Sequence, residues 1–90
     1  MTDGVAIVTG AGAGLGRALA IGLATKGITV VGLGRNGDAL DETGGLASRG
    51  FHPVIADVAN PASVAAAFAR ADAIGPVTLL INNAAVYPRR

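Results

Sequence analysis

The chain has 90 residues, of which 51% are hydrophobic and 14% are charged, and its formal net charge is +1. This composition is typical of a globular protein, and a nearly neutral charge gives no basic surface for nucleic acid. Cysteine is absent, which excludes disulfides and thiolate metal ligands, and no metal site is expected. No apolar run reaches the length of about 18 residues that a membrane span needs, and the N-terminus has no basic signal-peptide region. We therefore expect one domain or part of one, in the cytoplasm and away from membranes.

Strand-like and helix-like runs alternate in the first half of the chain. Residues 5–9 (VAIVT) form a short β-branched run and predict a buried strand, which a glycine cluster ends. The residues that follow predict a helix that stops at Gly27, with Arg17 and Lys26 on its solvent face. Its expected apolar stripe consists of Leu15, Ala18, Leu19 and Leu23. Residues 28–33 (ITVVGL) predict the second strand.

The helix expected at residues 38–49 has a weaker signal. Asn36 or Asp38 provides an N-cap, but Thr43-Gly44-Gly45 lies in the helix interior. Each glycine inside a helix costs about 1 kcal/mol relative to alanine. We therefore expect this helix to be short, bent or frayed.

The second half repeats the alternation. Residues 51–56 (FHPVIA) predict a third strand, and Pro53, which cannot donate to a ladder, predicts that this strand lies at a sheet edge. Asn60-Pro61 is a strong helix start, because asparagine is a good N-cap and proline suits the first helical position. The expected apolar stripe of this helix consists of Val64, Ala67, Phe68, Ala71 and Ile74. Gly75-Pro76 ends the helix, and residues 77–81 (VTLLI) predict a fourth strand that is buried on both faces.

The element order βαβαβαβ predicts an α/β fold with a four-stranded parallel, doubly wound sheet. Connections between parallel strands are right-handed, and helices then cover the faces of the sheet. In such sheets, ligands bind beside the carboxyl ends of the strands. The functional residues are therefore expected where strands end.

The first strand ends in the strongest motif of the chain, a run of four glycines at alternate positions from Gly10 to Gly16. Glycines let backbone N–H groups approach a pyrophosphate, and the helix N-terminus that follows supplies further N–H donors. The spacing differs from G-x-G-x-x-G, because position 15 is Leu and position 17 is Arg, and no G-K-[ST] follows. A glycine-rich chain also produces such spacing by composition, so a simple tight turn is the alternative. The position between a strand and a helix favours nucleotide binding.

Three motifs at successive strand ends make the chain resemble the short-chain dehydrogenase/reductase family. They are Thr9-Gly10-x-x-x-Gly14-x-Gly16, Asp57-Val58 and Asn82-Asn83-Ala84. The resemblance covers nearly the whole chain. It implies that residues 1–90 form the N-terminal half of a Rossmann-like NAD(P)-binding domain that belongs to an oxidoreductase.

The resemblance also implies a set of cofactor contacts. Asp57 is expected to contact the adenine amino group, with the backbone of Val58 beside the ring, and the alternative for Asp57 is a turn or cap residue before Asn60. The chain departs from the family's Asn-Asn-Ala-Gly at Ala85, where a Cβ alters the approach to the cofactor. The expected cofactor-binding residues are Gly10, Gly12, Ala13, Gly14, Leu15, Gly16, Arg35, Asn36, Asp57, Val58, Asn83, Ala84 and Ala85.

The end of the second strand predicts which cofactor binds. A carboxylate there accepts hydrogen bonds from the ribose hydroxyls of NAD, whereas a cation pairs with the 2′-phosphate of NADP. The chain has Gly34 and Arg35 at this point, which leaves space and provides a bidentate donor. NADP is therefore the expected cofactor and NAD the less favoured one. The alternative is that Arg35 is an ordinary surface arginine.

The catalytic residues that the resemblance implies, a Tyr followed four positions later by Lys, with Ser and Asn, cannot be located in these 90 residues. The only tyrosine is Tyr87 and the only lysine is Lys26. Ser48 and Ser63 fall on predicted helices, and a lone His52 at the start of an edge strand is more typical of a solvated residue. We expect the catalytic positions to lie beyond Arg90, and no catalytic residue is assigned here.

Two hypotheses follow. In the first, the chain is the N-terminal cofactor-binding segment of an NADP(H)-dependent oxidoreductase, a homo-oligomer that transfers hydride between nicotinamide and a carbonyl or alcohol substrate, and the segment alone is inactive. In the second, it is a non-catalytic nucleotide-binding module or an assembly partner that offers its fourth strand to another chain.

Overall fold

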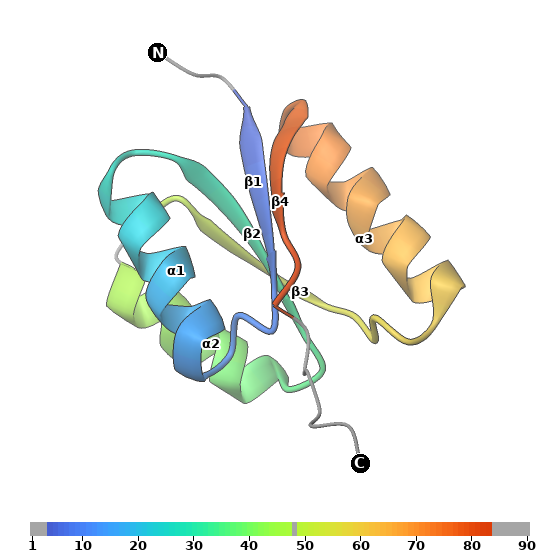
Figure 1. Ribbon diagram of the computed structural model, residues 1–90, viewed down its shortest axis with the longest axis horizontal. Coiled ribbons are helices and arrows are strands. Elements are labelled where there is room, and N and C mark those ends of the chain that lie inside the picture. The colour runs from blue at the N-terminus through green and yellow to red at the C-terminus, as the bar shows by residue number, and fades with distance from the viewer. Residues whose placement is uncertain (1–3, 48, 84–90) are drawn as a thin grey trace.

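The computed structural model describes residues 4–47 and 49–83, which contain three helices and four strands. Figure 1 shows their arrangement. Strands and helices alternate strictly along this part of the chain, and every expected element is confirmed, with bounds that differ by at most two residues. The elements are β1 (Val5–Thr9), α1 (Gly14–Thr25), β2 (Thr29–Gly34), α2 (Gly37–Ala47), β3 (Phe51–Ile55), α3 (Pro61–Ile74) and β4 (Val77–Ile81).

The described strands form one parallel sheet in the order β3-β2-β1-β4. The chain moves outward from β1 to β2 and β3, and then crosses back to place β4 on the other side of β1. The strand order therefore reverses between β1 and β4, and the carboxyl ends of these two strands are where doubly wound sheets bind ligands. The edge position predicted from Pro53 is confirmed, because β3 pairs only with β2.

Helices cover both faces of the sheet, with α1 and α2 on one face and α3 on the other (Figure 1). Each face has its own core cluster. The cluster under α3 consists of Val5, Ile7, Val31, Leu33, Val54, Ala56, Ala67 and Ala71. The cluster under α1 and α2 consists of Val8, Ala11, Ala20, Ala24, Val30, Leu40 and Ala47. Within the predicted stripe of α3, Ala67 and Ala71 are buried as expected, whereas Ile74 is exposed.

The predicted apolar stripe of α1 is wrong. The buried residues of this helix are Gly16, Ala20 and Ala24, spaced four apart, while Leu15 is 64% exposed. The reason is the close approach of the helix to the end of β1: a Cβ on Gly16 would overlap the carbonyl oxygen of Gly10. At this separation only small side chains fit between the start of α1 and the sheet, so Leu15 is turned to solvent, whereas Leu23, farther along the helix, packs against the edge of the core.

The second helix, expected to be short, bent or frayed, is α2, which runs for 11 residues without a break across Thr43-Gly44-Gly45 and ends at Ala47, two residues before the predicted end. Thr43 is fully buried in it, and its hydroxyl donates to the carbonyl oxygen of Ala11 at 2.8 Å. Gly44 faces Phe51 of β3, where an added Cβ would lie 3.4 Å from Phe51 Cδ2, in ordinary van der Waals contact. Tertiary contacts here outweigh the low helix propensity of the glycine pair.

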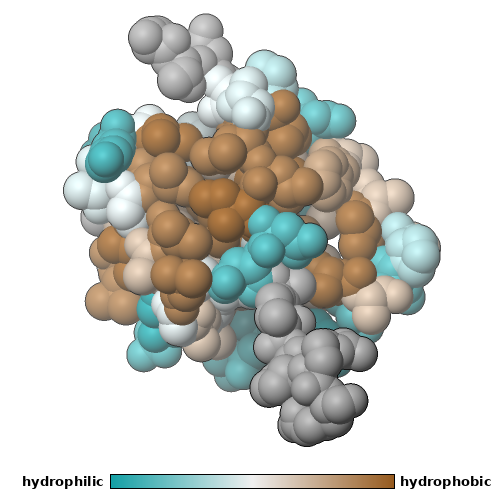
Figure 2. Space-filling model, in the orientation of Figure 1, coloured by the Kyte–Doolittle hydropathy of each residue, from teal (hydrophilic) through white to brown (hydrophobic). Residues whose placement is uncertain are grey.

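The outer edge of β4 has no strand beside it in the described part of the chain. Leu79 and Leu80 on this strand are 42% and 49% exposed, which contradicts the prediction that it is buried on both faces. Figure 2 shows hydrophobic surface gathered across the middle of the face on which β4 lies in Figure 1. Within residues 4–47 and 49–83, we find no helix with both the length and the hydrophobicity of a membrane-spanning segment.

Candidate functional site

The carboxyl ends of β1 and β4 are tied together by one side chain. The hydroxyl of Thr9 donates to Asn82 Oδ1 at 3.1 Å and accepts from the backbone N–H of Asn83 at 2.7 Å. Thr9 is buried, so both hydrogen bonds are partly shielded from water. The strand end that carries Asn83 is thereby fixed beside the start of the glycine-rich segment.

The glycine loop, residues 10–13, connects β1 to α1 and packs tightly against the end of β4 and against α2. A Cβ on Gly10 would lie 2.6 Å from the carbonyl oxygen of Asn83, and one on Gly12 would lie 3.0 Å from the Cβ of Ala39 in α2. Gly14, the first residue of α1, is different. It has a φ of +57°, and an added Cβ would meet no atom within 4 Å. Gly14 therefore faces open space at the junction of loop and helix.

The N-terminus of α1 has no cap, unlike the N-termini of the other described helices. Its N-cap residue, Ala13, is extended and makes no side-chain hydrogen bond to the first turn. In α3, by contrast, Asn60 Oδ1 accepts from the N–H groups of Ala62 at 2.9 Å and Ser63 at 3.2 Å. The first N–H groups of α1 therefore point out of the helix without an acceptor in the described part of the chain, which suits an anion.

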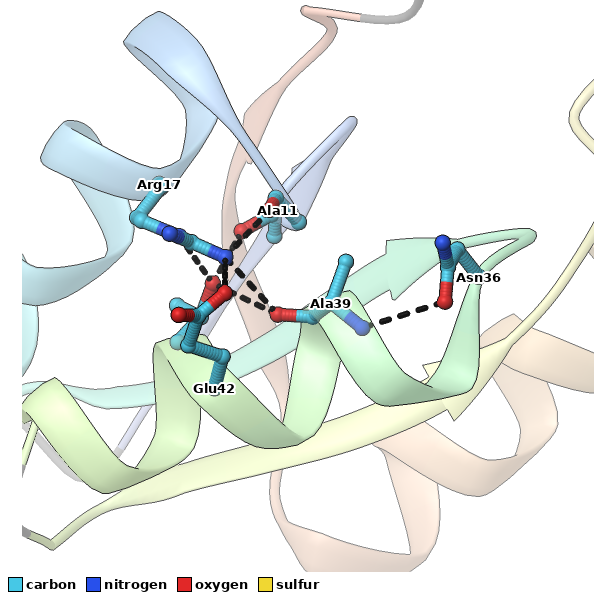
Figure 3. Close-up of polar contacts among 7 residues, drawn as sticks. Ala11, Arg17, Asn36, Ala39 and Glu42 are labelled. Atoms are coloured by element: carbon cyan, nitrogen blue, oxygen red, sulfur yellow. Dashed lines mark hydrogen bonds and ion pairs between the residues drawn. The ribbon is translucent and has the colours of Figure 1, made fainter.

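Sequence reasoning missed Arg17, which it placed on the solvent face of α1. The side chain instead reaches across to the glycine loop and α2 (Figure 3), and its Nη2 lies 3.0 Å from Glu42 Oε1. A signal was available in the sequence: a cation in the first turn of a helix opposes the helix dipole, so it is favourable only where other groups hold it.

The end of β2 carries Arg35 and Asn36, the residues expected to contact a 2′-phosphate. Arg35 is exposed and its guanidinium has no hydrogen-bond or ion-pair partner among residues 4–47 and 49–83. Asn36 is partly committed, because its Oδ1 accepts from the N–H of Ala39 at 3.1 Å and caps α2. The backbone N–H of Ala11 donates to Leu33 O at 3.0 Å, which holds the glycine loop next to this strand end.

The end of β3 carries Asp57 and Val58, and the turn role considered for Asp57 is confirmed. Its Oδ1 accepts from the N–H of Ala59 at 2.9 Å, and its own N–H donates to Ser63 Oγ at 2.9 Å. The second carboxylate oxygen of Asp57 has no partner within the described residues, and Val58 is exposed. A turn role and a ligand contact are therefore compatible at this position.

The remaining residues singled out from the sequence divide into two groups. Outside the described residues lie Ser48, Ala84, Ala85 and Tyr87. Of the others, His52 is exposed on β3, and Lys26 follows α1 at the end of that helix away from the glycine loop. The described part of the chain contains no group of three or more His, Cys, Asp or Glu side chains that could hold a metal ion.

A family model described as short chain dehydrogenase matches residues 4–90. The chain belongs to this family. L-xylulose reductase of Mus musculus is 40% identical over 81 residues, a match that covers 90% of this chain and 32% of the relative. D-erythrulose reductase of Gallus gallus is 42% identical over 81 residues, which cover 90% of this chain and 31% of the relative. The chain thus spans about a third of the length of the curated short-chain dehydrogenases it matches.

Solved structures of the family share the fold. An actinorhodin polyketide ketoreductase variant with NADPH has a TM-score of 0.85 and 32% identity, over 93% of this chain and 34% of that one. The 3-ketoacyl-(acyl-carrier-protein) reductase from Brucella melitensis complexed with NADH has a TM-score of 0.80 and 33% identity, over 86% and 32%. The Rossmann-like fold and the family resemblance are therefore confirmed, and the chain is an N-terminal segment of a short-chain dehydrogenase/reductase with the family's NAD(P)-binding fold.

Proposed function

We propose that residues 1–90 form the cofactor-binding part of an NADP(H)-dependent short-chain oxidoreductase, and that the protein containing them transfers hydride between nicotinamide and a carbonyl or alcohol substrate. The observation that carries this proposal is the uncapped N-terminus of α1, which opens beside the glycine loop at the point where the strand order reverses.

The proposed pyrophosphate site is made of backbone groups. The N–H groups of the loop and of the first turn of α1 supply hydrogen-bond donors, and the helix dipole adds a partial positive charge. The open space in front of Gly14 lets a phosphate approach these donors, because no protein atom lies within 4 Å of the position of its missing Cβ. The residues proposed here are Gly10, Gly12, Ala13, Gly14, Leu15 and Gly16.

The preference for NADP(H) rests on Arg35. Its guanidinium is exposed and has no partner within the described residues, so it is available to a 2′-phosphate, with which it can form two parallel hydrogen bonds. No acidic side chain competes at Gly34, where an added Cβ would lie 3.3 Å from Leu40. The side-chain N–H₂ of Asn36 has no acceptor among the described residues and can add a donor next to Arg35.

The adenine and the nicotinamide ribose complete the proposed arrangement. The second carboxylate oxygen of Asp57 can accept from the adenine amino group, with Val58 beside the ring. On the other side of the glycine loop, Asn83 is held by Thr9, and its backbone is proposed to line the ribose together with Ala84 and Ala85.

Fluorescence titration of the full-length protein with NADPH and NADH tests the proposal. We expect NADPH to bind more tightly, and Arg35→Ala to remove about 1.5 to 3 kcal/mol of NADPH affinity while NADH affinity stays the same. Arg70→Ala is the matched control, because Arg70 is also exposed but lies on α3, over the other face of the sheet. Equal affinities of the unaltered protein for the two cofactors, or an unchanged preference for NADPH over NADH in Arg35→Ala, would show that Arg35 is an ordinary surface arginine.

A further inference from the structure

We propose that Arg17 is a positioning residue for the cofactor: its guanidinium holds one carbonyl group of the glycine loop directly and the preceding one through the hydroxyl of Thr43, and so turns the N–H groups of the same peptide units toward the pyrophosphate. The inference rests on the cofactor site proposed above.

The guanidinium of Arg17 lies among oxygen atoms of the loop and of α2 (Figure 3). Its Nη2 donates to the carbonyl oxygen of Gly12 at 2.6 Å and to that of Ala39 at 3.1 Å, and its Nε donates to Thr43 Oγ1 at 2.9 Å. The Thr43 hydroxyl in turn donates to the carbonyl oxygen of Ala11 at 2.8 Å. Arg17 and Thr43 together therefore hold the carbonyl groups of Ala11 and Gly12.

Because each peptide unit is planar, holding these two carbonyl groups also fixes the direction of the N–H groups on the opposite side of the loop. A trans peptide unit is planar, and its N–H points away from its C=O. The carbonyl of Ala11 shares a peptide unit with the N–H of Gly12, and the carbonyl of Gly12 shares one with the N–H of Ala13. Since both carbonyls are held toward α2, both N–H groups point away from it. Neither N–H has an acceptor in the described part of the chain, so both are available to an anion.

The contacts of Arg17 are better explained by this role than by a surface ion pair. Its side chain is only 24% exposed, whereas the carboxylate partner, Glu42, is 68% exposed and its attraction is screened by water. The first turn of α1 is also the least favourable place in the helix for a cation, because the dipole has its positive end there. Hydrogen bonds to the carbonyl oxygens of Gly12 and Ala39, which carry partial negative charge, offset that repulsion.

The turn that carries Arg35 is held by other contacts. Asn36 O accepts from the N–H of Leu40 at 3.1 Å, and Gly34 O accepts from the N–H of Ala56 at 2.9 Å. Arg17 takes part in neither. Loss of Arg17 is therefore expected to disturb the pyrophosphate site and to leave the 2′-phosphate site in place, which makes the two roles separable by experiment.

The test uses the full-length protein and two ligands, NADPH and adenosine 2′-monophosphate, which carries the adenine and the 2′-phosphate but no pyrophosphate. We expect Arg17→Gln to weaken NADPH binding about tenfold, which corresponds to about 1.4 kcal/mol, and to change the affinity for adenosine 2′-monophosphate by less than about twofold. The matched control is Glu42→Gln, which removes the ion pair without touching the loop, and it should leave both affinities unchanged. Urea unfolding of each variant, followed by far-UV circular dichroism, measures the stability separately.

The outcomes separate this inference from the proposed function. In a folded Arg17→Gln variant, an equal loss of affinity for NADPH and for adenosine 2′-monophosphate would overturn the positioning role. An unchanged NADPH affinity in that variant would also overturn it. If Arg17→Gln does not fold, Thr43→Val replaces it: the variant should lose NADPH affinity, and Thr43→Ser, which restores the hydroxyl, should recover it. Failure of Thr43→Ser to recover the affinity would also overturn the role. An unaltered protein that binds neither ligand would overturn the proposed function itself.

Discussion

The three glycines of α1 offer an internal comparison that tests the proposed pyrophosphate site. We consider Gly14→Val together with Gly14→Ala, Gly16→Ala and Gly22→Ala. Gly14 and Gly22 both face open space, while the Cβ of a residue at position 16 would overlap the loop. Gly14 alone of these three has a positive φ, of +57°. Each substitution therefore changes a different combination of backbone strain, packing and ligand access.

The structure sets the expected magnitudes. Alanine at position 14 adds strain of about 1 to 2 kcal/mol from the left-handed backbone and no clash, and valine adds more because it is β-branched. Either side chain also occupies the proposed phosphate position, where the loss of a charge-assisted hydrogen bond costs about 1.5 to 3 kcal/mol of binding, or roughly 10- to 150-fold in affinity. Gly22→Ala is expected to stabilise α1 by about 0.5 to 1 kcal/mol with no effect on binding. Gly16→Ala is expected to cause the largest loss of stability.

Urea unfolding gives the stability of each variant, and titration of the folded protein with NADPH gives its affinity. We expect Gly14→Ala and Gly14→Val to lose NADPH affinity as well as stability, and the loss of affinity should remain once the affinity is corrected for the folded fraction. If both variants lose stability while the folded protein binds NADPH as tightly as before, the glycine cluster is only a turn and the pyrophosphate site is wrong. A loss of affinity in Gly22→Ala would show that the effect is not local to the start of the helix.

Three further predictions concern stability and assembly. Thr9→Val removes both hydrogen bonds to the end of β4 and is expected to lower the free energy of unfolding by about 1 to 3 kcal/mol, whereas Thr9→Ser should retain most of it. Asn60→Ala removes the cap of α3 and should lower the unfolding free energy by about 1 kcal/mol, with NADPH affinity unchanged because α3 covers the other face. Residues 1–90 expressed alone should associate in light-scattering measurements, because the outer edge of β4 has no strand beside it in the described part of the chain and Leu79 and Leu80 are exposed. They should also bind cofactor weakly and show no turnover, because the acid/base residues that the family resemblance implies cannot be located in them. A monodisperse, cooperatively unfolding monomer would contradict the expected association, and cofactor-dependent turnover would contradict the expected inactivity.

The sequence predicts the elements and their order because each signal for them is local. Asn60-Pro61 acts within one turn of helix, and the structure shows the expected cap. Pro53 removes one donor, and that loss is tolerated at the sheet edge where β3 lies. The positions of the glycine loop, Asp57 and Asn83 at strand ends follow from the alternation alone.

The buried face of α1 and the contacts of Arg17 could not be predicted in the same way, because both depend on how far the helix lies from groups that are distant in sequence. Leu15, Leu19 and Leu23 have the period of a buried stripe, yet the separation set by Gly16 and Gly10 selects alanine and glycine instead. Likewise, the four acceptors of Arg17 come from the loop and from α2, and three of them lie 22 to 26 residues away along the chain. A helical periodicity carries no information about either distance.

The two hydrogen bonds by which Thr9 joins the ends of β1 and β4 determine when the glycine loop is fixed during synthesis of the chain. The hydrogen bonds of Thr9 with Asn82 and Asn83 span 73 and 74 residues, so the loop that is translated first is held by a segment that is translated more than seventy residues later. Contacts of such high separation form late, because the intervening chain must be ordered before they can close. In a nascent chain that ends at β3, the glycine loop therefore lacks its contacts with the end of β4. We expect cofactor binding to stabilise the fold only after β4 has left the ribosome. In ribosome-bound chains of increasing length, protection by NADPH against proteolysis should begin only once Asn83 has emerged.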